Sequence, residues 1–182
     1  VRPLSGSWPW RRGVALLLGA LVLLLSLLTI SEYVFGRDLG IDEILVGDTT
    51  TTVGISPGRM GLHTAIGLAL SGIAIVLFAT RQAAAISIGQ ACSLAVAGIA
   101  LITSLGYVHS VTFLAAIRSY TQMSVPTTVS FLCLAGALLG IYPRAGLMES
   151  VTSPHAGGAM MRRLLPATLA VPFGIAWMVQ TG

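Results

Sequence analysis

Charged residues are scarce in this sequence, and lysine is absent. Only 9% of its 182 residues are charged, and all 10 basic residues are arginine. A soluble domain of ordinary composition carries about 25% charged residues. Hydrophobic residues instead make up 55% of the chain, and the mean hydropathy is +0.90. The lack of charge therefore excludes an ordinary soluble domain and predicts that much of the chain lies in a lipid bilayer.

Motifs for catalysis and for nucleic-acid binding are also missing. No Ser/His/Asp arrangement, glycine-rich phosphate loop or haem-type cysteine motif occurs, so we expect neither an enzyme nor a cofactor. The arginines do not form a basic stripe with interleaved aromatic residues, which argues against nucleic acid as a partner. The two cysteines, Cys92 and Cys133, fall at different depths in apolar segments. Packing roles are favoured there over a disulfide or a nucleophile.

Long apolar runs are what the chain has in abundance. The first covers residues 13–35, and no charge falls between Arg12 and Glu32. As a helix it can cross a hydrocarbon core of about 30 Å, and it exceeds the roughly 7–15 apolar residues of a signal peptide. We therefore predict an all-α, polytopic membrane helix bundle that forms a single domain over residues 1–182. The five expected spans are 13–35, 62–80, 83–107, 126–142 and 163–181, with an outer loop at 36–61 and an inner loop at 143–162.

The distribution of arginine predicts the orientation of these spans. With the N-terminus in the cytoplasm, more arginines lie inside than outside, as the positive-inside rule requires. Five spans then place the C-terminus outside, and we expect the membrane to be the bacterial cytoplasmic (inner) membrane. Two inner pairs, Arg11 with Arg12 and Arg162 with Arg163, are expected to contact lipid headgroups. The seven inner arginines are Arg2, Arg11, Arg12, Arg81, Arg144, Arg162 and Arg163, against Arg37, Arg59 and Arg118 outside.

Small residues four positions apart occur in three of the expected spans. This spacing lets helix backbones approach each other closely in a membrane. We expect packing within the chain, and the alternative is an interface with a second copy or with other membrane subunits. The three pairs are Gly67 and Ser71, Ala91 and Ala95, and Gly136 and Gly140.

The last expected span contains two prolines, Pro166 and Pro172. Because proline has no backbone N–H, the carbonyls of Arg162 and Thr168 lose their helical partners. A kink is therefore expected in this helix. It is either a feature of shape or a mobile element.

Ionisable groups are nearly absent from the expected spans. Glu32 lies at the boundary of the first, and His63 and His109 lie near the outer ends of theirs. Such groups can hold zinc, copper or iron, but no His-x-x-x-His or Glu-x-x-His spacing is present, so interfacial hydrogen bonding is favoured over a metal. The acids of the outer loop do not follow the spacing of a calcium loop. Pumps and ion-coupled carriers place ionisable groups near the membrane midplane. Because the expected spans lack such groups there, a small-solute carrier is only a weaker alternative.

Several polar segments resemble the multi-span N-terminal membrane region of bacterial sensor histidine kinases and diguanylate cyclases. The longest is EYVFGRDLGIDE at residues 32–43, and PGRM at 57–60 follows it. Thr64 and Ala65 also match, although the chain has His63 where the family pattern leads us to expect asparagine. Further matching segments are TQM at 121–123, YPRAGLM at 142–148, TS at 152–153, GG at 157–158 and RRLLP at 162–166.

The resemblance implies a non-catalytic sensory input module. In that family the membrane region is followed by a further span and by cytoplasmic PAS and transmitter domains. The present residues include no ATP or GTP site, so signalling would need a transmitter beyond them or on a partner chain. The alternative is an accessory subunit of a larger respiratory or photosynthetic membrane complex. The resemblance supplies neither a cofactor nor ligand-binding residues.

Overall fold

The computed structural model describes residues 9–35, 60–109 and 123–181, and these residues form helices without any strand. Three of the helices are long and apolar enough to cross a membrane, over Trp10–Phe35, Leu62–Thr80 and Ala83–Ser104. The all-helical fold expected from the sequence is thus confirmed, and these three helices are compatible with the expected membrane bundle. The helices are α1 (Pro9–Phe35), α2 (Leu62–Thr80), α3 (Ala83–His109), α5 (Val125–Ile141), α6 (Leu147–Thr152) and α7 (Ala156–Thr181).

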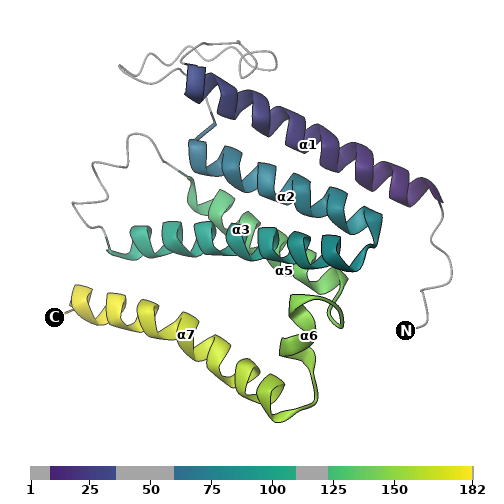
Figure 1. Ribbon diagram of the computed structural model, residues 1–182. Helices are drawn as coiled ribbons and strands as arrows, with labels where there is room; N and C mark the ends of the chain where they lie inside the picture. Colours follow the sequence, from purple (N-terminus) through teal and green to yellow (C-terminus); the bar gives the residue numbers. More distant parts are fainter. Residues whose placement is uncertain (1–8, 36–59, 110–122, 182) are drawn as a thin grey trace.

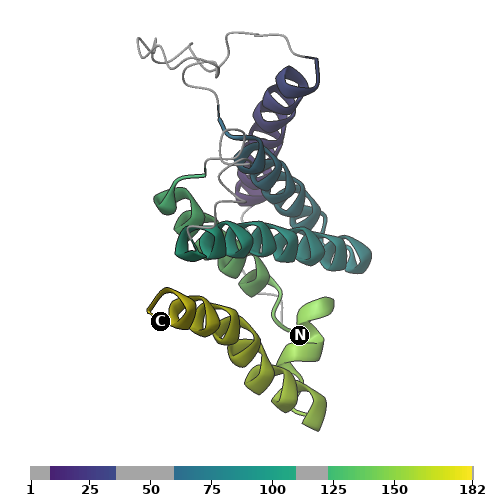
Figure 2. The same cartoon turned by 90° about the vertical axis from the view of Figure 1, so that its left-hand side faces the viewer.

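The helices pack in the order in which they follow one another along the chain. Contacts join α1 to α2, α2 to α3, and α3 to α5, while α7 contacts α3 and α6 (Figure 1). Only Arg81 and Gln82 separate α2 from α3, so these two helices run in opposite directions. The short helix α6 lies between the end of α5 and the start of α7, and α7 lies on the far side of the bundle from α1 (Figure 2).

Three helix starts differ from the expected span boundaries. Helix α1 begins at Pro9, several residues before the expected position 13. Proline suits a helix start, because the backbone N–H groups of the first turn have no partner within the helix and proline has no N–H. Helix α7 begins at Ala156, so part of the expected inner loop 143–162 is helical. Helix α5 begins at Val125, one residue before its expected boundary, and the Oγ of Ser124 accepts a hydrogen bond from the N–H of Thr127 at 3.3 Å, which satisfies one free donor of the first turn.

Glycines bring α1 and α2 into close contact. A Cβ added to Gly72 would lie 2.9 Å from the carbonyl oxygen of Gly19 and 3.0 Å from the amide nitrogen of Leu23. A Cβ added to Gly19 would in turn lie 3.0 Å from Ile75. The two backbones therefore meet at a distance that a side chain at Gly72 would prevent.

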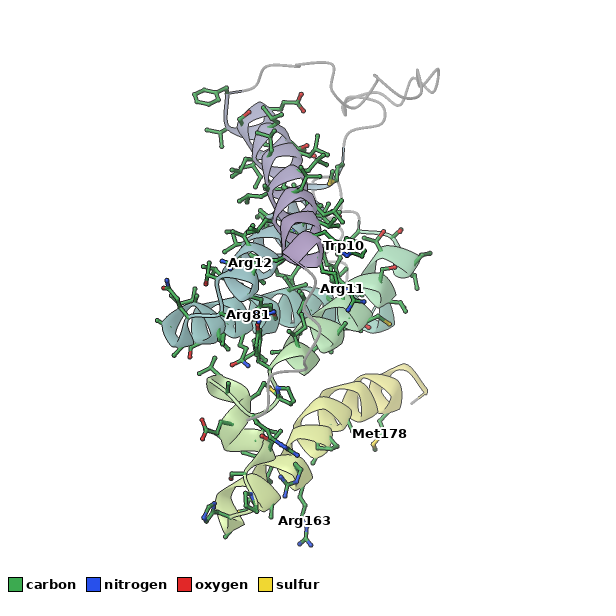
Figure 3. The ribbon with its side chains drawn as sticks, turned by 90° about the vertical axis from the view of Figure 1, so that its right-hand side faces the viewer. Trp10, Arg11, Arg12, Arg81, Arg163 and Met178 are labelled. Carbon is green, nitrogen blue, oxygen red and sulfur yellow. The ribbon has the colours of Figure 1, made fainter. Side chains whose placement is uncertain are left out.

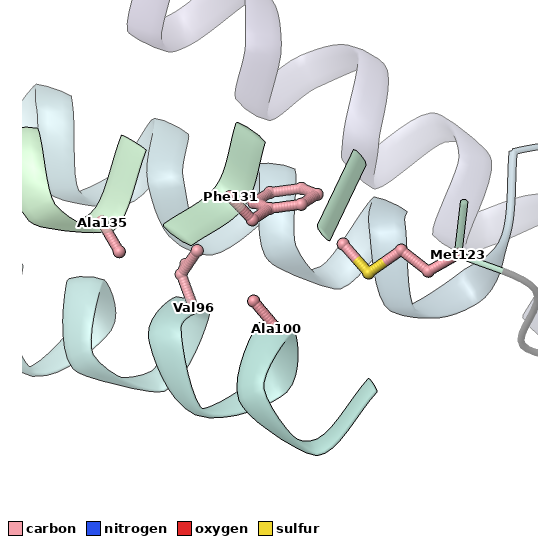
Figure 4. Close-up of a cluster of buried hydrophobic side chains, with 5 residues drawn as sticks. All are labelled: Val96, Ala100, Met123, Phe131 and Ala135. Atoms are coloured by element: carbon pink, nitrogen blue, oxygen red, sulfur yellow. The ribbon is translucent and has the colours of Figure 1, made fainter. Parts of the chain in front are cut away.

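A second contact is a cluster of buried apolar side chains between α3 and α5 (Figure 4). Phe131 lies at its centre and is 4% exposed. This ring also fills the space above Gly67 of α2, where an added Cβ would lie 2.9 Å from Cε1 of Phe131. The cluster thus joins three helices. Its buried members are Val96, Ala100, Met123, Phe131 and Ala135.

Hydroxyl groups inside the bundle are satisfied within their own helices. Ser26 donates to the carbonyl of Val22 at 2.7 Å, and Ser93 donates to that of Gly89 at 2.8 Å. Bonds of this kind let a hydroxyl lie in an apolar environment without an unpaired donor. These polar groups therefore do not mark a polar path through the bundle.

Candidate functional site

The side chain of Gln90 on α3 binds the segment that links α5 to α6. Its Nε2 donates to the carbonyls of Tyr142 at 3.0 Å and Ala145 at 2.9 Å. Its Oε1 accepts from the N–H groups of Leu147 at 2.7 Å and Met148 at 3.3 Å. One buried amide, 0% exposed, thus satisfies two carbonyls near the end of α5 and two free donors in the first turn of α6.

Gly146 is required beside this amide. Its φ is +61°, a conformation that glycine adopts at little cost. A Cβ at this position would lie 2.5 Å from Oε1 of Gln90 and 3.0 Å from Oγ of Ser87. Both the backbone conformation and the lack of space therefore exclude a side chain.

Tyr142 extends the same contact to α2. Its hydroxyl donates to the carbonyl of Phe78 at 3.1 Å, and the two rings lie 5.6 Å apart in a tilted arrangement. The ring of Phe78 in turn covers Gly89 of α3, where an added Cβ would lie 2.6 Å from Cε1. The end of α2, the first half of α3 and the α5–α6 link are therefore held together.

Helix α6 is bound at its other end by α7. The Nη1 of Arg162 donates to the carbonyls of Val151 at 2.8 Å and Ser153 at 3.2 Å. A cation at this place neutralises the partial negative charge of the helix C-terminus. Thr152 ties α6 back to the link, since its hydroxyl donates to the carbonyl of Pro143 at 2.6 Å. Gln90 and Arg162 thus connect α3 to α7 through α6, and we name this set of contacts the α6 bridge.

All six arginines in the described part of the chain lie at the end of the bundle that carries the α6 bridge. All six are exposed, and none forms an ion pair with a carboxylate in the described part of the chain. Figure 3 views this end: Arg11, Arg12 and Arg81 lie around the start of α1, while Arg163 projects from α7 away from them. The six are Arg11, Arg12, Arg81, Arg144, Arg162 and Arg163.

The opposite end carries the groups considered for a metal. Glu32 at the end of α1 is 1% exposed, and the Nδ1 of His63 at the start of α2 is buried without a hydrogen-bond partner. Nearby, the hydroxyl of Tyr33 donates to the carbonyl of Met60 at 2.9 Å. His109 ends α3, but its side chain lies outside the described residues, as does the outer loop over 36–59. Among the described residues no three His, Cys, Asp or Glu side chains come together to form a metal site.

The small-residue pairs differ in what they contact. Gly67 packs against Phe131, and Ser71 is 1% exposed. An added Cβ at Gly136 or Gly140 would meet nothing within 4 Å, so these two do not pack within the chain as expected. Ala91 and Ala95 on α3 are exposed as well. The close contact between α1 and α2 instead uses Gly19 and Gly72, which the four-residue spacing does not reveal because they lie on different helices.

The two prolines and the two cysteines lie on the helices in which they were predicted. Pro166 lies on the exposed side of α7, and the helix continues through Pro166 and Pro172 from Ala156 to Thr181. Cys92 and Cys133 are free, and Cys133 is exposed on α5.

Comparison of the chain with protein-family models, curated proteins and solved structures finds no match. The interpretation of function therefore rests on the residues and their geometry. The most specific arrangement is the α6 bridge, a hydrogen-bonded connection between the helix layer and α7.

Proposed function

We propose that this chain is a non-catalytic, membrane-spanning input module whose last helix passes a change in the bundle to a transmitter, within the same protein or on a partner. The observation that carries the proposal is the α6 bridge. Helix α7 contacts α3 and α6, and Arg162 binds the end of α6 while Gln90 binds its start. A shift of α3 can therefore reach α7 through the hydrogen bonds of the α6 bridge as well as through the direct contact between the two helices.

The exposed apolar surface of α7 supports this proposal. Residues exposed along it include Met160 at 67%, Val171 at 56% and Met178 at 70%. A helix held by few neighbours is free to change its position at low cost. The last helix is also the one from which the resembling sensor family continues toward its output.

A fusion of the chain to the next span and transmitter of the resembling family tests the proposal. We expect Arg162→Gln to change the basal output several-fold, because the guanidinium contacts to the end of α6 are lost. The matched control is Arg163→Gln, which removes an adjacent exposed charge that makes no described hydrogen bond. Basal output that is unchanged in Arg162→Gln, with normal insertion, would contradict transmission through the α6 bridge.

The orientation is proposed with the N-terminus and the arginine-rich end in the cytoplasm, and with five spans in a bacterial inner membrane. The gathering of six exposed arginines at one end supports it, since cytoplasmic segments carry the excess of arginine. In a cysteine-free variant, we expect a cysteine at position 48 to be labelled by a membrane-impermeant maleimide in intact cells. A cysteine at position 149 should be labelled only after the membrane is opened. Labelling only at position 149 in intact cells would show that the orientation is the opposite of the one proposed.

The second candidate function is an accessory subunit of a larger bioenergetic membrane complex. The open surface of α5 favours it, because Gly136 and Gly140 have room for a closely approaching helix and no described helix of this chain fills that room. Replacing both by leucine should then prevent assembly with the partner while leaving the isolated chain stable. Unchanged assembly would show that these glycines face lipid.

A further inference from the structure

We infer that α6 is a conditional helix, which forms only while α3 and α7 hold its two ends, and that its unfolding loosens α7 from the bundle. This inference deepens the proposed function, because it assigns a switch to the α6 bridge, and the signalling role of the switch rests on that function. The folding of α6 is nevertheless measured in the chain alone, without a transmitter.

Helix α6 has little of its own to stabilise it. It contains six residues, and none of them is buried, so it gains little free energy from apolar packing. Isolated helices shorter than about 12–15 residues are marginal in water, because the first turn is costly to form. Gly146, the residue before the first turn, has no side chain that caps the helix. Helix α6 is therefore stabilised from outside.

Side chains of two other helices cap the ends of α6. At its start, the Oε1 of Gln90 on α3 accepts from the N–H groups of Leu147 at 2.7 Å and Met148 at 3.3 Å. At its end, the Nη1 of Arg162 on α7 donates to the carbonyl of Val151 at 2.8 Å. Each cap satisfies backbone groups that a helix end leaves without partners. Because six residues make fewer than two helical turns, loss of either cap unfolds all of α6.

Unfolding of α6 lengthens the connection between the bundle and α7, which α6 spans (Figure 1). As a helix, the six residues cover about 9 Å, whereas a fully extended chain of the same length covers about 20 Å. Helix α7 is then held mainly by its direct contact with α3. The α6 bridge therefore has two states, and in the unfolded one α7 is free to move by up to roughly 10 Å.

Hydrogen–deuterium exchange of the full chain in detergent micelles, resolved at single amides by NMR, tests the inference. We expect the protection of α6 to fall about ten-fold in Arg162→Gln, because hydrogen bonds from a charged donor are lost. The loss should extend to the amides of Leu147 and Met148, at the end of α6 that Arg162 does not contact. Protection of α2 should stay unchanged, which excludes global unfolding. The matched control Arg163→Gln should retain the protection of the parent.

A variant that strengthens α6 itself separates helix stability from other effects of removing Arg162. Ser150 is exposed on α6, and alanine favours helix more than serine does. Adding Ser150→Ala to Arg162→Gln should therefore restore the protection of α6 by about two-fold.

Three results would overturn the inference. They are equal protection of α6 in the parent and in Arg162→Gln, a loss confined to the amides of Val151 and Thr152, which would show fraying of one end, and no gain from Ser150→Ala. The output of the fusion described above decides the proposed function separately. Loss of α6 protection with unchanged basal output would contradict the proposed function while supporting the conditional helix.

Discussion

Replacing Gln90 by leucine is expected to lower the free energy of unfolding by about 3–5 kcal/mol. The change leaves two carbonyls and two N–H groups around the α5–α6 link without their partner. A buried polar group left unpaired costs about 1–3 kcal/mol, and some of these groups regain water because the link is only partly buried. Unfolding of the purified chain in mixed detergent micelles measures the effect.

The control for this prediction is Gln82→Leu. Gln82 lies in the connection before α3 and is exposed, so its replacement should leave stability nearly unchanged. Gln90→Glu should be at least as destabilising as Gln90→Leu, because one oxygen of the buried carboxylate would face the carbonyl oxygens of Tyr142 and Ala145, which cannot donate to it. Equal stability of the Gln90 and Gln82 leucine variants would show that Gln90 does not hold the link.

Replacing Gly72 by leucine is expected to separate α1 from α2. The new Cβ alone would lie 2.9 Å from the backbone oxygen of Gly19, and backbone cannot move aside as a flexible side chain can. Overpacking of a well-filled contact costs about 1–3 kcal/mol, and occasionally more, so we expect a loss at or above the upper end of this range. The loss should appear both in the free energy of unfolding and as greater protease sensitivity between α1 and α2.

Gly136→Leu is the matched control for Gly72→Leu. It makes the same chemical change in another apolar helix, but at a position where an added Cβ meets nothing within 4 Å. Its stability in isolation should equal that of the parent or exceed it, since leucine favours helix more than glycine does. If both variants were destabilised alike, the loss would come from the added bulk or from insertion and not from the contact with Gly19.

The helical fold was predictable because apolar run length alone determines it in a bilayer. A run such as 13–35 has no other way to satisfy its backbone in lipid than to form a helix. Helix ends were less predictable: α7 begins at Ala156 and α6 lies inside an expected loop. The segment around α6 is held in place by Gln90, which lies on α3 and far away in the sequence, and by Arg162, which lies on α7.

The contacts that hold the site together were only partly visible in the sequence. Gln90 stands out as a neutral polar residue deep in an apolar run, but its partners lie more than fifty residues away. The spacing of Gly136 and Gly140 predicts close packing, yet only the arrangement of helices shows which glycines have a neighbour. Gly72 does pack closely although no spacing pattern marks it, because its partner Gly19 belongs to another span.

The proposal that this chain acts through α7 on a transmitter is tested most directly by site-specific photo-cross-linking in native membranes. A photoreactive amino acid at Val171 on α7 is compared with one at Leu24 on α1, which are 56% and 59% exposed. The account predicts that position 171 forms a discrete adduct with a protein segment carrying a transmitter domain, while position 24 forms adducts with lipid. Lipid adducts alone at position 171 would contradict it.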